Sequence, residues 1–141
     1  MLVDRYSKSW VVAHLTFQEP LEVLSYFNLT LAYNTGAAFS FLHSASGWQN
    51  IFFSGMAFII STAVIVWLYK TPARERWLCA ALALILAGAI GNAWDRLLYG
   101  YVIDFLDFHY QGWHFAIFNI ADSAICVGAF MLCVYWFRAG K

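Results

Sequence analysis

The sequence predicts a membrane α-helical bundle that carries a small outward-facing antiparallel β-sheet, in a single domain covering residues 1–141. Hydrophobic residues make up 62% of the chain and charged residues 11%, whereas soluble domains average about 45–50% and about 25%. Three internal runs are apolar over about 20 residues, the helical length that crosses a bilayer. An earlier stretch instead alternates apolar and polar residues, which is typical of a half-buried strand.

The region 20–42 is expected to form strands outside the membrane. Apolar and polar residues alternate from Phe27 to Asn34, and this period of two predicts a strand. Asn34, Thr35 and Gly36 then supply turn chemistry, so residues 37–42 are expected to return as a second strand.

The three apolar runs are expected to be membrane spans, and they lie at about 49–69, 77–97 and 113–137. The first is free of charged residues from Ile51 to Tyr69. All three are internal, so none resembles a cleavable signal peptide.

The positively charged residues predict how the spans are oriented. Lys and Arg are absent from residues 9–48 and 97–112 and gather at the other ends of the spans, at Lys70, Arg74, Arg76, Arg138 and Lys141. Because positively charged loops stay in the cytoplasm, the two segments without them face outward. We therefore expect a multi-pass membrane protein whose positively charged ends lie in the cytoplasm.

Charge and composition exclude several classes of function. The formal net charge is zero and no long basic run occurs, so nucleic acid is not an expected partner. The histidines and cysteines lack the spacing of a metal site, and no metal or cofactor is expected. The cysteines lie in apolar runs, where we expect them only to pack; they are Cys79, Cys126 and Cys133.

Asp122 is the most informative single residue, because it is the only Asp, Glu, Lys or Arg in the third expected span. An ionised carboxyl group at membrane depth costs about 3 kcal/mol on insertion scales, so such residues usually mark functional sites. Asn119 lies three residues earlier and is expected on the same helix face. The alternative is an Asp that only fastens the bundle through hydrogen bonds.

A second polar cluster ends the second span. Asn92, Asp95 and Arg96 follow the spacing i, i+3 and i+4 and therefore share one helix face. Gly88 and Gly91 would allow a neighbouring helix to approach closely. Arg96 either faces a substrate or extends to the interface while pairing with Asp95.

Asp104 follows among apolar residues and supplies a second partly buried carboxyl group. Two carboxyl groups in one confined site share a proton, so that one acts as acid while the other activates water, as in aspartic proteases. Asp107 is a rival for this role, although its surroundings have the character of an interfacial loop.

Five motifs run in order along nearly the whole chain: Asp4–Lys8, Asn34–Ser40, Gly91–Arg96, Val102–Phe105 and Phe118–Ser123. Together they resemble the lipoprotein signal peptidase family, also called signal peptidase II. The resemblance implies an aspartic endopeptidase that removes the signal peptide of diacylglyceryl-modified prolipoproteins, just before the lipidated cysteine. It also implies a protein of the bacterial inner (cytoplasmic) membrane, with its active site toward the periplasmic face and in contact with membrane lipid. A monomer is the expected state.

The resemblance also implies roles for individual residues. Asp104 and Asp122 correspond to the catalytic pair of the family. The implied pocket residues are Asn92, Asp95, Arg96, Asn119, Asn34 and Gly36, and the implied supporting residues are Asp4 and Lys8. The family has four spans, the first upstream of the Asp4 motif, so this chain is expected to lack most of that span.

Two other classes of function remain open from the residues alone. A transporter or proton-relay subunit also places Asp and Arg inside the membrane, but a relay needs such groups from one face to the other. A structural assembly protein would use Asp104 and Asp122 only for folding. Serine catalysis is a weaker alternative, because no serine lies in a recognisable nucleophile turn.

Overall fold

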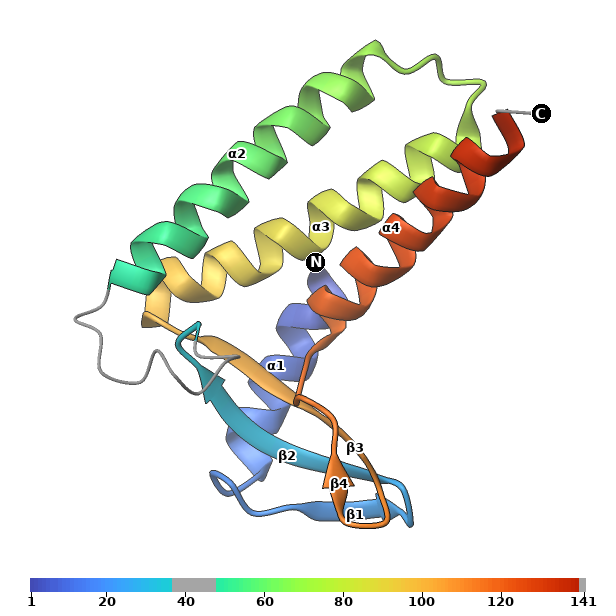
Figure 1. Cartoon of the computed structure of the whole chain (residues 1–141). Coiled ribbons are helices and arrows are strands. Elements are labelled where there is room, and N and C mark those ends of the chain that lie inside the picture. Colours follow the sequence, from blue (N-terminus) through green and yellow to red (C-terminus); the bar gives the residue numbers. More distant parts are fainter. Residues whose placement is uncertain (37–47, 140–141) are drawn as a thin grey trace.

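The computed structural model of the chain describes residues 1–36 and 48–139. Its elements, in order, are α1 (Leu2–His14), β1 (Leu21–Leu24), β2 (Phe27–Asn34), α2 (Trp48–Lys70), α3 (Arg76–Tyr99), β3 (Val102–Tyr110), β4 (Trp113–His114) and α4 (Ile120–Ala139). The three long helices lie at one end of the molecule and the strands at the other, where the shorter α1 runs beside the sheet (Figure 1).

The three long helices confirm the predicted membrane bundle. By length and composition, Asn50–Lys70, Arg76–Tyr99 and Ile120–Arg138 can each cross a membrane. The last of these begins at Ile120, later than the expected start near residue 113, because Asn119 caps the helix. Asp122 therefore lies in the first turn of α4 and not deep inside a span, which corrects the sequence-based placement.

Helix α3 packs between α2 and α4 (Figure 1). Two glycines allow α3 and α4 to touch. A methyl group added at Gly88 would overlap the carbonyl oxygen of Ala121, and one added at Gly128 would lie 2.7 Å from the carbonyl oxygen of Ala81. The close approach expected at Gly88 is thus present, and it occurs beside the turn that carries Asp122.

The sheet is antiparallel, with the strand order β1-β2-β3-β4. Strand β2 confirms the predicted strand, but its burial does not follow the alternation, since the buried residues are Asn28, Thr30 and Leu31. Ala32 pairs with Asp104 across β2 and β3. The sequence pattern did not reveal β3, because Val102–Phe105 is buried on both faces and therefore lacks alternation. The second strand expected at residues 37–42 falls outside the described part of the chain.

Two apolar clusters flank a layer of buried polar groups. One cluster joins α1 to the sheet through Val11, Leu31, Ile103 and Phe105. The other lies farther along the bundle at Val64, Leu78 and Leu82. The buried polar side chains come from four elements: Lys8 from α1, Asn92 and Asp95 from α3, Asp104 from β3, and Asn119 from the residue directly before α4.

The α3–α4 contact gives a first prediction. Gly88→Ala should lower stability by about 1–3 kcal/mol, because the added methyl group must push α4 away at Ala121. Gly55→Ala is the matched control, because a methyl group there has no neighbouring atom within 4 Å. Thermal unfolding in detergent measures both variants, and equal melting temperatures would contradict the proposed close packing.

Candidate active site

The two carboxyl groups expected to act together come from different elements that meet beneath the bundle. Gly100 adopts a left-handed conformation with φ 78°, which ends α3 and turns the chain into β3, where Asp104 lies. Asp122 lies in the first turn of α4. The side chain of Asn119 donates to Asp104 and also accepts from the backbone of Asp122, so it links the two.

Asp104 is enclosed and bound by two amides. Its Oδ1 accepts from Asn119 Nδ2 at 2.7 Å and its Oδ2 accepts from Asn34 Nδ2 at 3.0 Å. Burial raises the pKa of Asp104 to about 6, and the negative charge of Asp122 adds to this effect. The two amide hydrogen bonds and the charge of Lys8 act in the opposite direction. Asp104 is therefore a carboxyl group that holds a proton closer to neutral pH than usual.

Asp122 is fixed by a reciprocal pair of hydrogen bonds at the start of α4. The backbone N–H of Asp122 donates to Asn119 Oδ1 at 2.9 Å, and the backbone N–H of Asn119 donates to Asp122 Oδ2 at 3.2 Å. This arrangement is a capping box, which satisfies amides that a helix start otherwise leaves free. Asn92 Nδ2 donates to the remaining oxygen of Asp122 at 2.7 Å.

The orientation of the Asn34 amide follows from the turn after β2. Asn34 Oδ1 accepts from the backbone N–H of Gly36 at 2.8 Å, so its Nδ2 is left to donate to Asp104. Gly36 has φ 97°, a backbone conformation that glycine adopts without steric cost. Both residues therefore contribute to the surroundings of Asp104.

A cluster of charged residues lies behind the amides. Lys8 pairs with Asp95 at 2.8 Å and with Asp4 at 3.0 Å, and it donates to Asn92 Oδ1 at 3.1 Å. Asp95 was expected in the pocket, but its partners among the described residues are Lys8, Arg5 and the backbone N–H of Ile103. The sequence reasoning missed Arg5, although it lies inside the motif that contains Asp4 and Lys8.

Arg96 keeps one guanidinium nitrogen unpaired in the described part of the chain. Its guanidinium lies 5.3 Å from the ring centroid of Phe53 on α2, a cation–π contact. Within residues 1–36 and 48–139, its buried Nε has no hydrogen-bond partner, and Asp95 forms its ion pairs with Arg5 and Lys8 instead. The alternative in which Arg96 pairs with Asp95 is therefore wrong.

Asp107 does not join the other two carboxyl groups. It accepts from Thr30 Oγ1 at 2.9 Å and contacts His114 Nδ1 at 2.9 Å, and it lies on strand β3 rather than in the expected loop. Burial alone would raise the pKa of Asp107, but hydrogen bonds from His114 and Thr30 outweigh burial and lower it. These contacts give Asp107 a structural role within the sheet.

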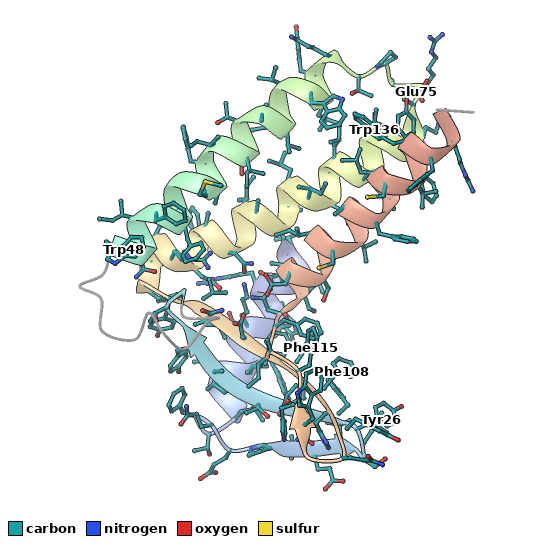
Figure 2. All side chains as sticks on the ribbon, in the orientation of Figure 1. Tyr26, Trp48, Glu75, Phe108, Phe115 and Trp136 are labelled. Carbon is teal, nitrogen blue, oxygen red and sulfur yellow. The ribbon has the colours of Figure 1, made fainter. Side chains whose placement is uncertain are left out.

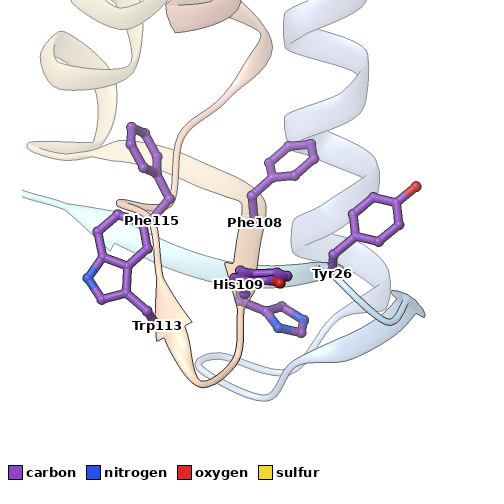
Figure 3. A pocket seen from close by; sticks show the side chains of 6 residues that line it. Tyr26, Phe108, His109, Trp113 and Phe115 are labelled. Carbon is purple, nitrogen blue, oxygen red and sulfur yellow. The ribbon is translucent and has the colours of Figure 1, made fainter.

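The far end of the sheet carries an aromatic cavity of about 270 Å³ (Figure 3). The labelled rings of Phe108 and Phe115 point toward the helices, and Tyr26 lies at the edge (Figure 3). None of the expected catalytic or pocket residues lines this cavity; its lining residues are Tyr26, Phe108, His109, Tyr110, Trp113 and Phe115. The described residues also contain no group of three His, Cys, Asp or Glu side chains suited to a metal ion.

Comparison with known proteins decides the family. The family model described as signal peptidase (SPase) II matches residues 1–138. The chain belongs to the signal peptidase II family. It is therefore a peptidase, and its spans make it a multi-pass membrane protein.

Relatives and solved structures agree with this assignment. The chain is 50% identical over 135 residues to a lipoprotein signal peptidase of Coxiella burnetii, covering 96% of this chain and 83% of that protein. It is 52% identical over 129 residues to a lipoprotein signal peptidase of Yersinia enterocolitica, covering 92% and 76%. A solved bacterial membrane enzyme matches with a TM-score of 0.85 and 32% identity, covering 99% of this chain and 84% of the other.

The contacts of Asp107 give a second prediction. Asp107→Asn should lower stability by about 1–3 kcal/mol, because the buried Thr30 and the exposed His114 both lose a charged acceptor. Peptidase activity should remain close to that of the unmodified protein. Thermal unfolding and a cleavage assay on the same preparation separate the two effects, and loss of activity in a stably folded variant would restore Asp107 as a catalytic candidate.

Proposed function

We propose that this protein is an aspartic endopeptidase that removes the signal peptide of diacylglyceryl-modified bacterial prolipoproteins, just before the lipidated cysteine. Asp104 and Asp122 form the catalytic pair in this proposal. The main support is the set of amide hydrogen bonds that connects the two carboxyl groups through Asn119. The names of the relatives at 50% and 52% identity support the substrate class.

The chemistry needs one protonated and one ionised carboxyl group. The ionised group takes a proton from a water molecule, which attacks the scissile carbonyl carbon, while the protonated group donates its proton to the carbonyl oxygen. The tetrahedral intermediate then collapses: the carboxyl group that took a proton from water gives it to the leaving nitrogen, and the other, now ionised group takes a proton back from a hydroxyl group of the intermediate. The raised pKa of Asp104 suits it to hold the shared proton, although the two groups titrate as a pair.

Arg96 and the pocket amides are the proposed substrate contacts. The guanidinium of Arg96 is held against Phe53, and its buried Nε has no partner within the described residues, so it can donate to a backbone carbonyl of an extended peptide. Asn34 and Gly36 lie at the end of β2, beside Asp104, and form the outer wall of the pocket.

The distribution of buried polar side chains favours a peptidase over a proton relay. Among the described residues, every buried polar or charged side chain belongs to α1, the sheet, the last turns of α3 or the start of α4. The opposite ends of the long helices bury apolar residues such as Leu78 and Leu82. A proton relay would need ionisable groups at those opposite ends of the helices as well.

We further propose that the sheet end faces the periplasm and rests at the lipid boundary of the inner membrane. Lys70 and Arg138 lie at the end of the bundle away from the sheet, the end that the positive-inside rule places in the cytoplasm. Trp48 lies near the sheet end of the bundle, and Trp136 lies near the other (Figure 2). The exposed rings around the aromatic cavity, such as Trp113, are of the type that contacts lipid headgroups.

The catalytic assignment gives a third prediction. Asp104→Asn and Asp122→Asn should each abolish cleavage of a diacylglyceryl-modified prolipoprotein, because Asn keeps the size of Asp but cannot exchange the proton. The loss in the double variant should be no greater than in either single variant. Purified full-length protein provides the assay, and the unmodified precursor is the substrate control.

Near-normal cleavage by either single variant in folded form would contradict the catalytic pair. Cleavage of the unmodified precursor at the same rate would contradict the lipid requirement. Absence of cleavage of either substrate by the wild-type protein would remove the proposed function.

The orientation gives a fourth prediction. A cysteine introduced at Glu22, exposed on β1, should react with a membrane-impermeant thiol reagent in cells with a permeabilised outer membrane. A cysteine introduced at Arg74, between α2 and α3, should react only after the inner membrane is disrupted. Both are made in a background whose three native cysteines are replaced by Ala. The reverse pattern of labelling would overturn the proposed orientation.

A further inference from the structure

Lys8 is a buried, charged side chain that peptide hydrolysis does not itself require. Its side chain is 0% exposed, although it belongs to the short helix α1. A buried ammonium group is costly unless each of its three N–H donors finds an acceptor. Lys8 has three: Asp95 Oδ2 at 2.8 Å, Asp4 Oδ2 at 3.0 Å and Asn92 Oδ1 at 3.1 Å.

The third of these contacts determines how the Asn92 amide points. An ammonium group can only donate, so it must face the oxygen of the amide. Asn92 Oδ1 also accepts from Asn119 Nδ2 at 3.1 Å, and Asn92 Nδ2 is left to donate to Asp122 Oδ1 at 2.7 Å. A reversed amide would place its NH₂ group against the ammonium and its oxygen against the carboxylate, and both contacts would be repulsive.

We infer that Lys8 is a positioning residue for the reaction, whose ammonium fixes the amide hydrogen bonds of Asn92 and Asn119 that hold the two catalytic carboxyl groups. This inference rests on the proposed function, because it assumes that Asp104 and Asp122 perform the chemistry. The ion pair with Asp95 would be sufficient to fasten α1 to α3, and the pair with Asp4 lies within α1. The bond from Lys8 to Asn92 adds a connection to the catalytic pair.

The charges around Lys8 make this role measurable. The charged groups that face it or are linked to it through one or two amides are Asp4 and Arg5 on α1, Asp95 on α3, Asp104 on β3 and Asp122 on α4. Burial has the largest effect on the pKa of Asp104 and raises it, whereas the charge of Lys8 lowers it. Loss of the ammonium should therefore raise the pKa of Asp104 further.

The experiment compares four forms of the full-length protein with a diacylglyceryl-modified prolipoprotein as substrate. They are the wild type, Lys8→Met, the charge-balanced double variant Asp4→Asn with Lys8→Met, and Arg5→Gln. The double variant leaves Arg5 to pair with Asp95, so a buried charge is not left alone. Arg5→Gln is the matched control, because it removes a positive charge beside the same Asp95 without a contact to Asn92.

In the Lys8 variants, kcat should fall roughly tenfold to a hundredfold, the effect expected for a lost hydrogen bond to a charged group. KM should change little, because Lys8 is not a substrate contact. The alkaline limb of the pH profile should move to higher pH. Arg5→Gln should lower the melting temperature and leave the pH profile where it is in the wild type.

Wild-type kcat and pH profile in a folded Lys8 variant would overturn the inference. It would also be overturned if both Lys8 variants failed to fold while Arg5→Gln folded, because Lys8 would then have a purely structural role. Absence of cleavage by the wild type itself would instead remove the proposed function, so the two failures are distinguishable.

Discussion

The amide side chain of Asn119 is the contact on which the candidate site depends. Its nitrogen donates to Asp104 on β3 and its oxygen accepts from the first turn of α4, so one residue joins the sheet to the bundle. Burying Asp104 and half-burying Asp122 is costly without such donors. Asn34 and Asn92 complete the set, and each carboxylate oxygen of the pair thereby has a hydrogen-bond partner.

The packing of α3 against α4 determines how close these amides lie to the two carboxyl groups. Gly88 allows α4 to touch α3 at Ala121, next to Asp122, and thereby brings Asn92 within reach of that carboxyl group. Asp4 on α1 also reaches this point, where its Oδ1 accepts from the backbone N–H of Ala121 at 2.9 Å. Packing and hydrogen bonding are therefore coupled at the start of α4, where a small displacement would separate the pair.

Local patterns were sufficient for much of the fold but not for the contacts of the site. Apolar run length predicted the long helices, and the alternation from Phe27 to Asn34 predicted β2. Strand β3 was missed because both faces of Val102–Phe105 are buried. The start of α4 was placed too early because the apolar run extends upstream of the capping box, where the helix begins. The contact between Lys8 and Asn92 joins distant parts of the chain and has no local signal.

The state of the pair can be measured without substrate. Infrared difference spectra between the wild type and Asp104→Asn report the carboxylic acid C=O band of that side chain as the pH changes. The account predicts a band that persists in mildly acidic solution and disappears as the pH rises through about 6, because burial favours the protonated form. Ionisation of Asp104 near the ordinary value of about 3.9 would contradict a shared, enclosed pair.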